Sequence, residues 1–180
     1  MEVCFQVVRK KMIKNKINIQ LIDLYLQYIK IMTSNFDIDY KFGNKFEKET
    51  KTILGGTDNF VIMEGEFKAY DIIDKNTGIK YEVKSDRYTL STKNLAIEFE
   101  YKKRGSGITT TESDFYYYYP TDYYENYYYY YIIPTSAIKD IIKKKPWKEI
   151  LVKNNTKCYL IPEREFSKYL IQRYNEECFV

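Results

Sequence analysis

The chain has 180 residues, of which 44% are hydrophobic and 30% charged, a balance typical of one soluble globular domain with a substantial core. Its net charge of +4 is a mild bias towards acidic partners, and the absence of histidine excludes His-based general bases and most zinc sites. The sequence contains no apolar run of membrane-spanning length and no secretory leader, and its three cysteines lack metal-ligand spacing, so we expect a soluble intracellular protein with reduced thiols.

Residues 1–36 are expected to form a helical extension of the domain. Within this segment, residues 16–32 place apolar side chains at a helical period: Leu21, Ile22, Tyr25, Tyr28, Ile29 and Met32. The extra helix either packs on the domain or contacts a second copy of the chain in a homodimer. The sequence leaves both alternatives open. Residues 37–180 show no further domain boundary.

A second helix is predicted over residues 39–54. Asp37 or Asp39 is its expected N-cap, and Gly55-Gly56 ends it. Its inward face is expected to carry Phe42, Phe46, Thr50 and Ile53. Glu47 lies on the neighbouring face, where it is either an ordinary surface residue or a contributor to a site.

Residues 60–63 read as a first strand, and residues 66–86 as a β-hairpin. The turn Asp74-Lys75-Asn76-Thr77-Gly78 has Asn and Gly for left-handed backbone and Asp to bond its own backbone. Apolar and β-branched residues flank it on both sides. If the strands pair symmetrically about Asn76 and Thr77, then Asp71 lies directly across from Glu82.

This register predicts a cluster of charged groups. Facing residues have Cβ atoms about 5 Å apart, so two carboxylates there repel each other unless something holds them together. Glu82 and Lys84 leave the same face of one strand, roughly 7 Å apart. Two carboxylates with the nearby Val83 carbonyl suit a hard divalent cation such as Mg²⁺, with Mn²⁺ as a substitute. A lysine beside them can position water or offset charge on phosphate.

The next strand is predicted over residues 94–100. Leu95, Ile97 and Phe99 alternate with polar positions that include Glu98. Glu98 is either a further member of the charged cluster or a cross-strand partner for lysine. A basic loop follows, and its glycines allow the backbone to approach a phosphate closely. The loop residues are Lys102, Lys103, Arg104, Gly105, Ser106 and Gly107.

The tyrosine-rich tract is predicted to form a second hairpin, with strands over 115–119 and 127–133. A short helix with its N-cap at Thr135 or Ser136 is predicted to follow, and Trp147 is the expected core anchor. A strand over 157–161 and a helix over 163–174 complete the chain. We therefore expect an α/β fold, with a mixed β-sheet flanked by helices.

Several of these segments occur together in one known family. Asp71 followed by Glu82-Val83-Lys84 resembles the signature of the PD-(D/E)XK (restriction-endonuclease-like) nuclease superfamily, with Tyr70 in the place of its proline. The later segments are similar to those of phage and large-virus members. The resemblance covers about residues 37–170, and its later segments are Asn94-Leu95-Ala96-Ile97-Glu98, Lys102-Lys103-Arg104, Ser106-Gly107-Ile108 and Thr111-Glu112-Ser113-Asp114.

The resemblance implies a restriction-endonuclease-like core that hydrolyses phosphodiester bonds in DNA with Mg²⁺ or Mn²⁺, with RNA not excluded as a substrate. It implies a location in the host cytoplasm or virion. The alternative is a nucleic-acid-binding or structural protein that keeps the fold without cleavage. The implied catalytic residues are Asp71, Glu82 and Lys84, with Glu47 and Glu98 as candidates for a second site. The implied metal ligands are Asp71, Glu82 and the Val83 carbonyl, and the implied nucleic-acid-binding residues are Lys102, Lys103, Arg104, Ser106 and Gly107.

Overall fold

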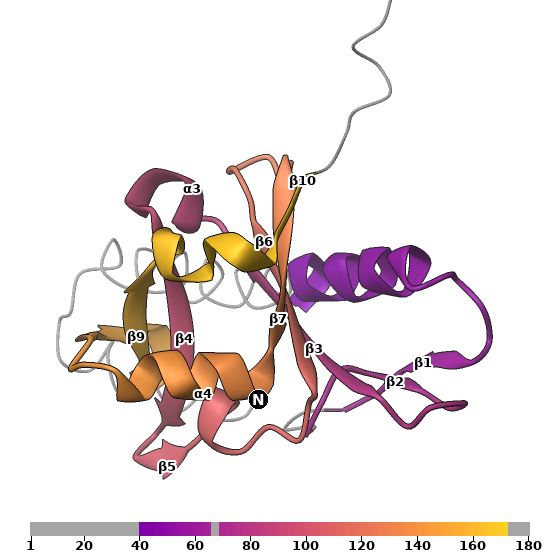
Figure 1. Cartoon of the computed structure of the whole chain (residues 1–180), viewed down its shortest axis with the longest axis horizontal. Coiled ribbons are helices and arrows are strands. Elements are labelled where there is room, and N and C mark those ends of the chain that lie inside the picture. Colours follow the sequence, from indigo (N-terminus) through magenta and orange to yellow (C-terminus); the bar gives the residue numbers. More distant parts are fainter. Residues whose placement is uncertain (1–39, 66–68, 173–180) are drawn as a thin grey trace, which may run out of the picture. The chain divides into compact units, whose positions relative to one another are not determined.

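The computed structural model describes residues 40–65 and 69–172 (Figure 1). The predicted extension over residues 1–36 lies outside the described residues, and so does the predicted N-cap of the second helix. The described residues from Phe42 onward belong to one compact unit. This unit is an α/β structure with a mixed six-stranded sheet and an antiparallel four-stranded sheet. None of the described helices is long and apolar enough to cross a membrane.

The first described element is the helix that includes residues 40–53. The strands are β1 (Phe60–Ile62), β2 (Ile72–Asp74), β3 (Lys80–Asp86), β4 (Asn94–Tyr101), β5 (Arg104–Gly105), β6 (Phe115–Pro120), β7 (Tyr129–Pro134), β8 (Lys148–Val152), β9 (Thr156–Pro162) and β10 (Leu170–Gln172). The further helices are α3 (Thr89–Thr92) and α4 (Thr135–Lys143), and the 3₁₀ turns are η1 (Gly107–Thr109), η2 (Lys153–Asn155) and η3 (Glu163–Tyr169).

The six-stranded sheet has the order β1-β2-β3-β6-β7-β10, and the four-stranded sheet has the order β5-β4-β9-β8. Among the described strands, β3 and β6 form the one parallel pair, in which Glu82 lies beside Tyr116 and Lys84 beside Tyr118. Between these two strands the chain passes through β4 and β5 of the other sheet. The predicted mixed sheet is therefore confirmed, and a second sheet accompanies it.

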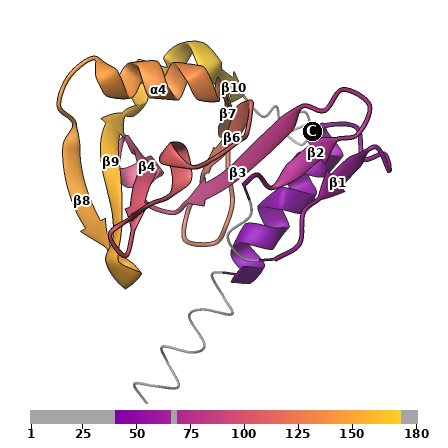
Figure 2. The same cartoon turned by 90° about the horizontal axis from the view of Figure 1, so that it is seen from below.

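The six-stranded sheet is covered on both faces. Phe42 and Phe46 pack against one face, where they meet Val83 and Tyr117. The other face carries Tyr116 and meets the four-stranded sheet and α4 through a core that includes Leu95, Ile97, Tyr118, Ile138 and Ile161. Figure 2 shows the helix of residues 42–53 beside β1, β2 and β3, away from β4, β8 and β9. Alternate residues of β3 and β6 thus point into two different cores.

The inward face of the first described helix was predicted correctly in three of its four positions. Phe42, Phe46 and Thr50 are buried. Ile53 is 38% exposed, so its assignment to the inward face was wrong. The residue lies in the last turn, just before the helix ends.

The hairpin has the predicted register. Ile72 pairs with Tyr81 and Ile73 with Lys80, the pairing that symmetry about Asn76 and Thr77 requires. The turn is held by Asp74, which accepts hydrogen bonds from the Asn76 backbone N–H at 2.9 Å and the Thr77 hydroxyl at 2.6 Å. The tyrosine hairpin is confirmed as well, because β6 and β7 are antiparallel neighbours.

The C-terminal part differs from the expectation in two places. Residues 148–152 form β8, a strand that pairs with β9 and was not predicted. The expected helix over 163–174 is wrong, because η3 gives way to β10 at Leu170. Leu170 and Ile171 pair with Tyr131 and Tyr130 of β7, so backbone pairing at the sheet edge replaces a further helical turn.

Candidate active site

The candidate site lies where the β2–β3 hairpin opens. The backbone N–H of Asp71 donates to the Tyr81 carbonyl at 2.9 Å, and the N–H of Val83 donates to the Asp71 carboxylate at 2.6 Å. In a strand, the N–H and C=O of one residue point to the same edge. The Val83 carbonyl therefore leaves β3 on the edge where Asp71 stands. The Asp71 carboxylate thus takes the place of a backbone acceptor at this edge of β3, where the backbone pairing with β2 has ended.

Glu82 and Lys84 form an ion pair on the neighbouring face of β3. The Lys84 Nζ atom lies 2.8 Å from Glu82 Oε1. The Glu82 side chain is only 9% exposed, whereas that of Lys84 is 39% exposed, so Lys84 is the more accessible member of the pair. The Glu82 charge, followed by that of Asp71, raises the pKa of Lys84 above its ordinary value, while burial opposes the rise. Lys84 is thus held fully protonated at neutral pH.

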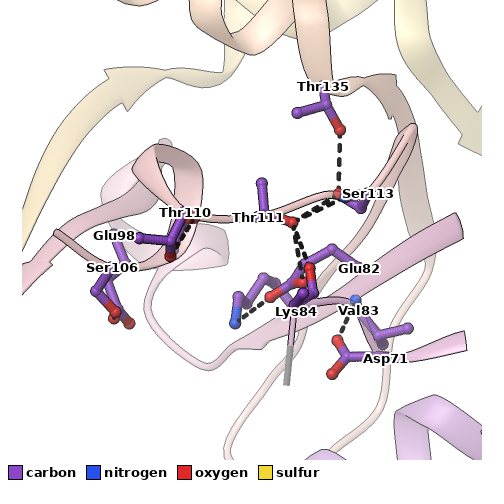
Figure 3. Close-up of polar contacts among 12 residues, drawn as sticks. Asp71, Glu82, Val83, Lys84, Glu98, Ser106, Thr110, Thr111, Ser113 and Thr135 are labelled. Atoms are coloured by element: carbon purple, nitrogen blue, oxygen red, sulfur yellow. Dashed lines mark hydrogen bonds and ion pairs between the residues drawn. The ribbon is translucent and has the colours of Figure 1, made fainter. Parts of the chain in front are cut away.

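Figure 3 shows Asp71, Glu82, Val83 and Lys84 gathered at one point of β3, as the sequence predicted. Asp71 and Glu82 are both buried, at 6% and 7% exposure. Each carboxylate has a different hydrogen-bond donor, Val83 N–H for Asp71 and Lys84 for Glu82. The mutual repulsion expected from the sequence is therefore offset within the protein itself.

A row of hydroxyl groups adjoins Glu82 and was not singled out from the sequence. The Thr111 hydroxyl lies 3.5 Å from Glu82 Oε2 and 3.0 Å from the Ser113 hydroxyl. Ser113 in turn lies 3.1 Å from the hydroxyl of Thr135, the first residue of α4. Ser113 and Thr135 are buried. The T-x-x-D turn of the sequence, Thr111 to Asp114, carries two of these groups and was the signal available in advance.

Glu98 lies in β4, to one side of the Glu82–Lys84 pair (Figure 3). Its carboxylate accepts a hydrogen bond from the Ser106 hydroxyl. Gly107, with φ of 51°, packs against the backbone of Glu98, where a Cβ would lie 2.5 Å from the Glu98 carbonyl oxygen. Ser106 and Gly107 therefore contact Glu98 directly and hold the loop against β4.

Glu98 and Lys84 nevertheless act on a common neighbour, the thiol of Cys158. Burial first, and then the negative charges of Glu98 and Asp86, raise the pKa of Cys158 to about 11, whereas Lys84 lowers it. Cys158 pairs with Glu98 across β4 and β9. Glu98 and Lys84 thus share Cys158 as an electrostatic neighbour. Its membership in a second metal site stays a prediction.

Glu47 is half-buried on the helix of residues 40–53. The buried residues of that helix pack on the sheet face that carries Val83, opposite to the face that carries Glu82. Its predicted role in the site stays a prediction too.

The basic loop is the tip of the β4–β5 hairpin. Glu100 pairs with Gly105 and Tyr101 with Arg104, so Lys102 and Lys103 are the two turn residues. Both have positive φ, 47° and 66°, as a two-residue hairpin turn requires. Lys102, Lys103 and Arg104 are all exposed. The loop therefore presents three cationic side chains to solvent.

The oxygen donors of the site suit a hard divalent cation. Asp71 and Glu82 supply carboxylate oxygens and Val83 a carbonyl, the ligand types that Mg²⁺ prefers. Within residues 40–65 and 69–172, no group of three or more His, Cys, Asp or Glu side chains is arranged to hold a metal ion. A cation held by two carboxylates fits this set if it keeps several of its waters, as Mg²⁺ usually does.

No protein family and no curated protein sequence matches this chain.

Proposed function

We propose that this protein is a Mg²⁺-dependent nuclease that hydrolyses phosphodiester bonds in DNA. The observation that carries the proposal is that Asp71, Glu82 and Lys84 lie together beside one part of β3, where Lys84 is partly exposed. These three residues are those that resemble the PD-(D/E)XK signature. The parallel β3–β6 pair within a mixed sheet, with a helix on one face, supports a restriction-endonuclease-like core.

In this proposal, Asp71 and Glu82 hold the cation, and the Val83 carbonyl is a further ligand. When bound, the cation stabilises charge on the phosphate and lowers the pKa of a coordinated water. Lys84 carries a permanent positive charge at neutral pH and reaches solvent, so it can position the attacking water or stabilise the charge that develops on phosphate. Water adds to phosphorus, one P–O ester bond breaks, and the proton lost by water ends on the leaving oxygen.

Lys84 has two states in this scheme. It is paired with Glu82 at 2.8 Å in the structure, and its ammonium group would turn towards the phosphate with a cation held at Glu82. A flexible four-carbon stem makes such a movement inexpensive. Binding of the cation and release of Lys84 would then be one event.

The exposed tip formed by Lys102, Lys103 and Arg104 is the proposed contact to the nucleic-acid backbone. Contacts of lysine and arginine with phosphates position a duplex without reading its sequence. RNA remains an alternative substrate on the same chemistry. Ser106 and Gly107, which follow this tip in the chain, would hold it in place through their contacts with Glu98.

A second candidate is a nucleic-acid-binding or structural protein that retains the fold and does not cleave. The observation that favours it is the closed Glu82–Lys84 pair in a set of described residues without a three-ligand metal cluster. In such a protein, the pair only stabilises β3. The basic tip would still bind nucleic acid.

The two candidates are separated by a cleavage assay. Duplex, single-stranded and branched DNA, together with RNA, are incubated with the protein in Mg²⁺, in Mn²⁺ and in EDTA. The nuclease proposal expects cleavage that requires a divalent cation and is lost in Glu82→Gln. Binding without cleavage of any substrate in either metal would favour the second candidate and contradict the first.

A further inference from the structure

Tyr116 lies beside Glu82 in the parallel β3–β6 pair and shares its side of the sheet. It is 2% exposed, and its hydroxyl has no hydrogen-bond partner among the described residues. A buried hydroxyl without a partner is costly and uncommon in folded proteins. The burial of the Tyr116 hydroxyl therefore calls for a role beyond packing.

The neighbouring Tyr118 shows what a structural tyrosine does in this sheet. Its hydroxyl donates to Asp86 at 2.7 Å and accepts the Ala96 N–H at 3.0 Å, so it joins the two sheets. The Tyr116 hydroxyl makes no such connection. Removal of the Tyr116 hydroxyl would break no close hydrogen bond of the resting fold, whereas removal of the Tyr118 hydroxyl would break three, including the 3.4 Å contact with Thr89.

The surroundings of the Tyr116 hydroxyl are those of the site. Burial first, and then the charge of the Glu82 carboxylate, raise the pKa of Tyr116, whereas the Lys84 ammonium group and a hydrogen bond with Thr111 lower it. Both members of the ion pair thus act on this hydroxyl. Tyr116 stays neutral at physiological pH and remains a hydrogen-bond donor.

We infer that Tyr116 is a positioning residue for Glu82, and that its hydroxyl is the donor that holds the carboxylate when Lys84 leaves it. Glu82 is buried, and in the metal-free protein a buried carboxylate that loses a charged partner is strongly destabilised. The hydroxyl of Thr111, 3.5 Å from Oε2, is too far for a good hydrogen bond and already lies near other acceptors. The Tyr116 hydroxyl makes no close hydrogen bond among the described residues, although Thr111 acts on it as a hydrogen-bond partner. Tyr116 is therefore a second donor available beside Glu82.

The inference about donor exchange concerns the folded protein alone and can be tested without activity. Its consequence for cleavage rests on the proposed nuclease function. In that setting, Tyr116 keeps Glu82 in place while Lys84 turns towards the phosphate. The donor exchange and its effect on cleavage are measured in separate experiments.

The primary test is a double-mutant cycle on the free energy of unfolding, measured in EDTA. Tyr116→Phe alone should leave stability unchanged or slightly higher. Lys84→Met removes the ammonium group and keeps the stem, and in this background Tyr116→Phe should lower the folding equilibrium constant by about tenfold, as expected for a hydrogen bond to a charged group. Adding Glu82→Gln should reduce this coupling, because the amide no longer carries the charge that the hydroxyl holds.

Tyr117→Phe is the matched control, since Tyr117 is the buried neighbour on the opposite sheet face. It should behave identically with and without Lys84. Equal effects of Tyr116→Phe in the parent and in Lys84→Met would overturn the inference. If Lys84→Met is too unstable for denaturation, Lys84→Gln replaces it in the same cycle.

The second measurement is cleavage by Tyr116→Phe. If the parent cleaves DNA, kcat should fall by about tenfold while KM and DNA affinity are unchanged, since only the placement of Glu82 is affected. A parent without cleavage would contradict the proposed function and leave the stability cycle decisive for Tyr116. A cleaving parent with no coupling in the cycle would contradict the role of Tyr116 alone.

Discussion

The carboxylate of Asp71 accepts the backbone N–H of Val83 at 2.6 Å, so a side chain of one strand completes the hydrogen bonding of the next. The sequence had suggested repulsion between Asp71 and Glu82 as the dominant interaction in the metal-free protein. The structure adds two favourable interactions for Asp71, a hydrogen bond from a backbone donor and the attraction of the nearby Lys84.

Asp71→Asn is therefore expected to lower the stability of the metal-free protein by about 1–2 kcal/mol, because a hydrogen bond to a charged acceptor becomes one to a neutral acceptor. Mg²⁺ should raise the melting temperature of the parent and not that of the variant. Melting curves in EDTA and in Mg²⁺ measure both effects. Asp140→Asn is the control, because Asp140 is an exposed acid on α4 that forms a 3.7 Å ion pair with Lys143. A metal-free Asp71→Asn protein that is more stable than the parent would contradict this prediction.

Lys84→Ala should reduce cleavage by at least ~100-fold while leaving DNA binding nearly intact, as the loss of a charge-stabilising group usually does. Lys80→Ala is a close control, because Lys80 lies in the same strand and forms an ion pair of similar length, 2.7 Å, with Glu112. It should retain the turnover of the parent. Single-turnover cleavage and a binding titration give the two quantities. Equal turnover in Lys84→Ala and the parent would remove Lys84 from the mechanism.

Replacement of Lys102, Lys103 and Arg104 by alanine should weaken DNA binding irrespective of sequence. The slope of log K against log salt should become shallower by up to about three phosphate contacts. A variant with alanine at Lys139, Lys143 and Lys144, which are exposed on or beside α4, removes the same charge elsewhere. Binding measured over a range of salt concentrations distinguishes them. An equal change of slope in both variants would mean that only net charge matters.

Stability should fall at alkaline pH. Burial, the largest cause in each case, raises the pKa of Cys158 to about 11 and that of Tyr117 to about 12. The pKa of each group is higher in the folded protein than in the unfolded chain. The stability that each group contributes is therefore fully present below its ordinary pKa and is lost as the pH rises through its raised pKa. Denaturant titrations from pH 8 to pH 12 should show the decline, less steep in Tyr117→Phe. Constant stability over this range would contradict the prediction.

The extent to which the sequence predicted the fold differs between elements for physical reasons. The hairpin about Asn76 and Thr77 was found with its register, because turn residues and strand alternation are local signals. The pairing of β3 with β6 is not local, since it joins residues more than thirty positions apart, and the periodicity of either strand says nothing about it. Strand β8 was missed because Lys148 and Glu149 are charged and Leu151 is 67% exposed, so no alternation marks this edge strand.

The candidate site was predicted where it depends on the hairpin. Asp71, Glu82 and Lys84 meet as expected, because the register and the two-residue period of a strand fix their places. The neighbours that come from other elements were not predicted. Tyr116 reaches Glu82 only through the parallel pair, and Thr111 only through the loop before β6. In the sequence, Tyr116 is one tyrosine among twenty-one.

The turn at Lys102 and Lys103 has an energetic consequence. Both residues adopt positive φ, a conformation that glycine and asparagine accept readily and that strains a residue with a long side chain. Lys102→Asn with Lys103→Gly should therefore raise the free energy of unfolding by about 1 kcal/mol or more, and thermal or denaturant unfolding would measure the gain. The same change should weaken DNA binding by removing two cations. The protein thus keeps a hairpin that folds less favourably than it could, at a position where three exposed positive charges lie together.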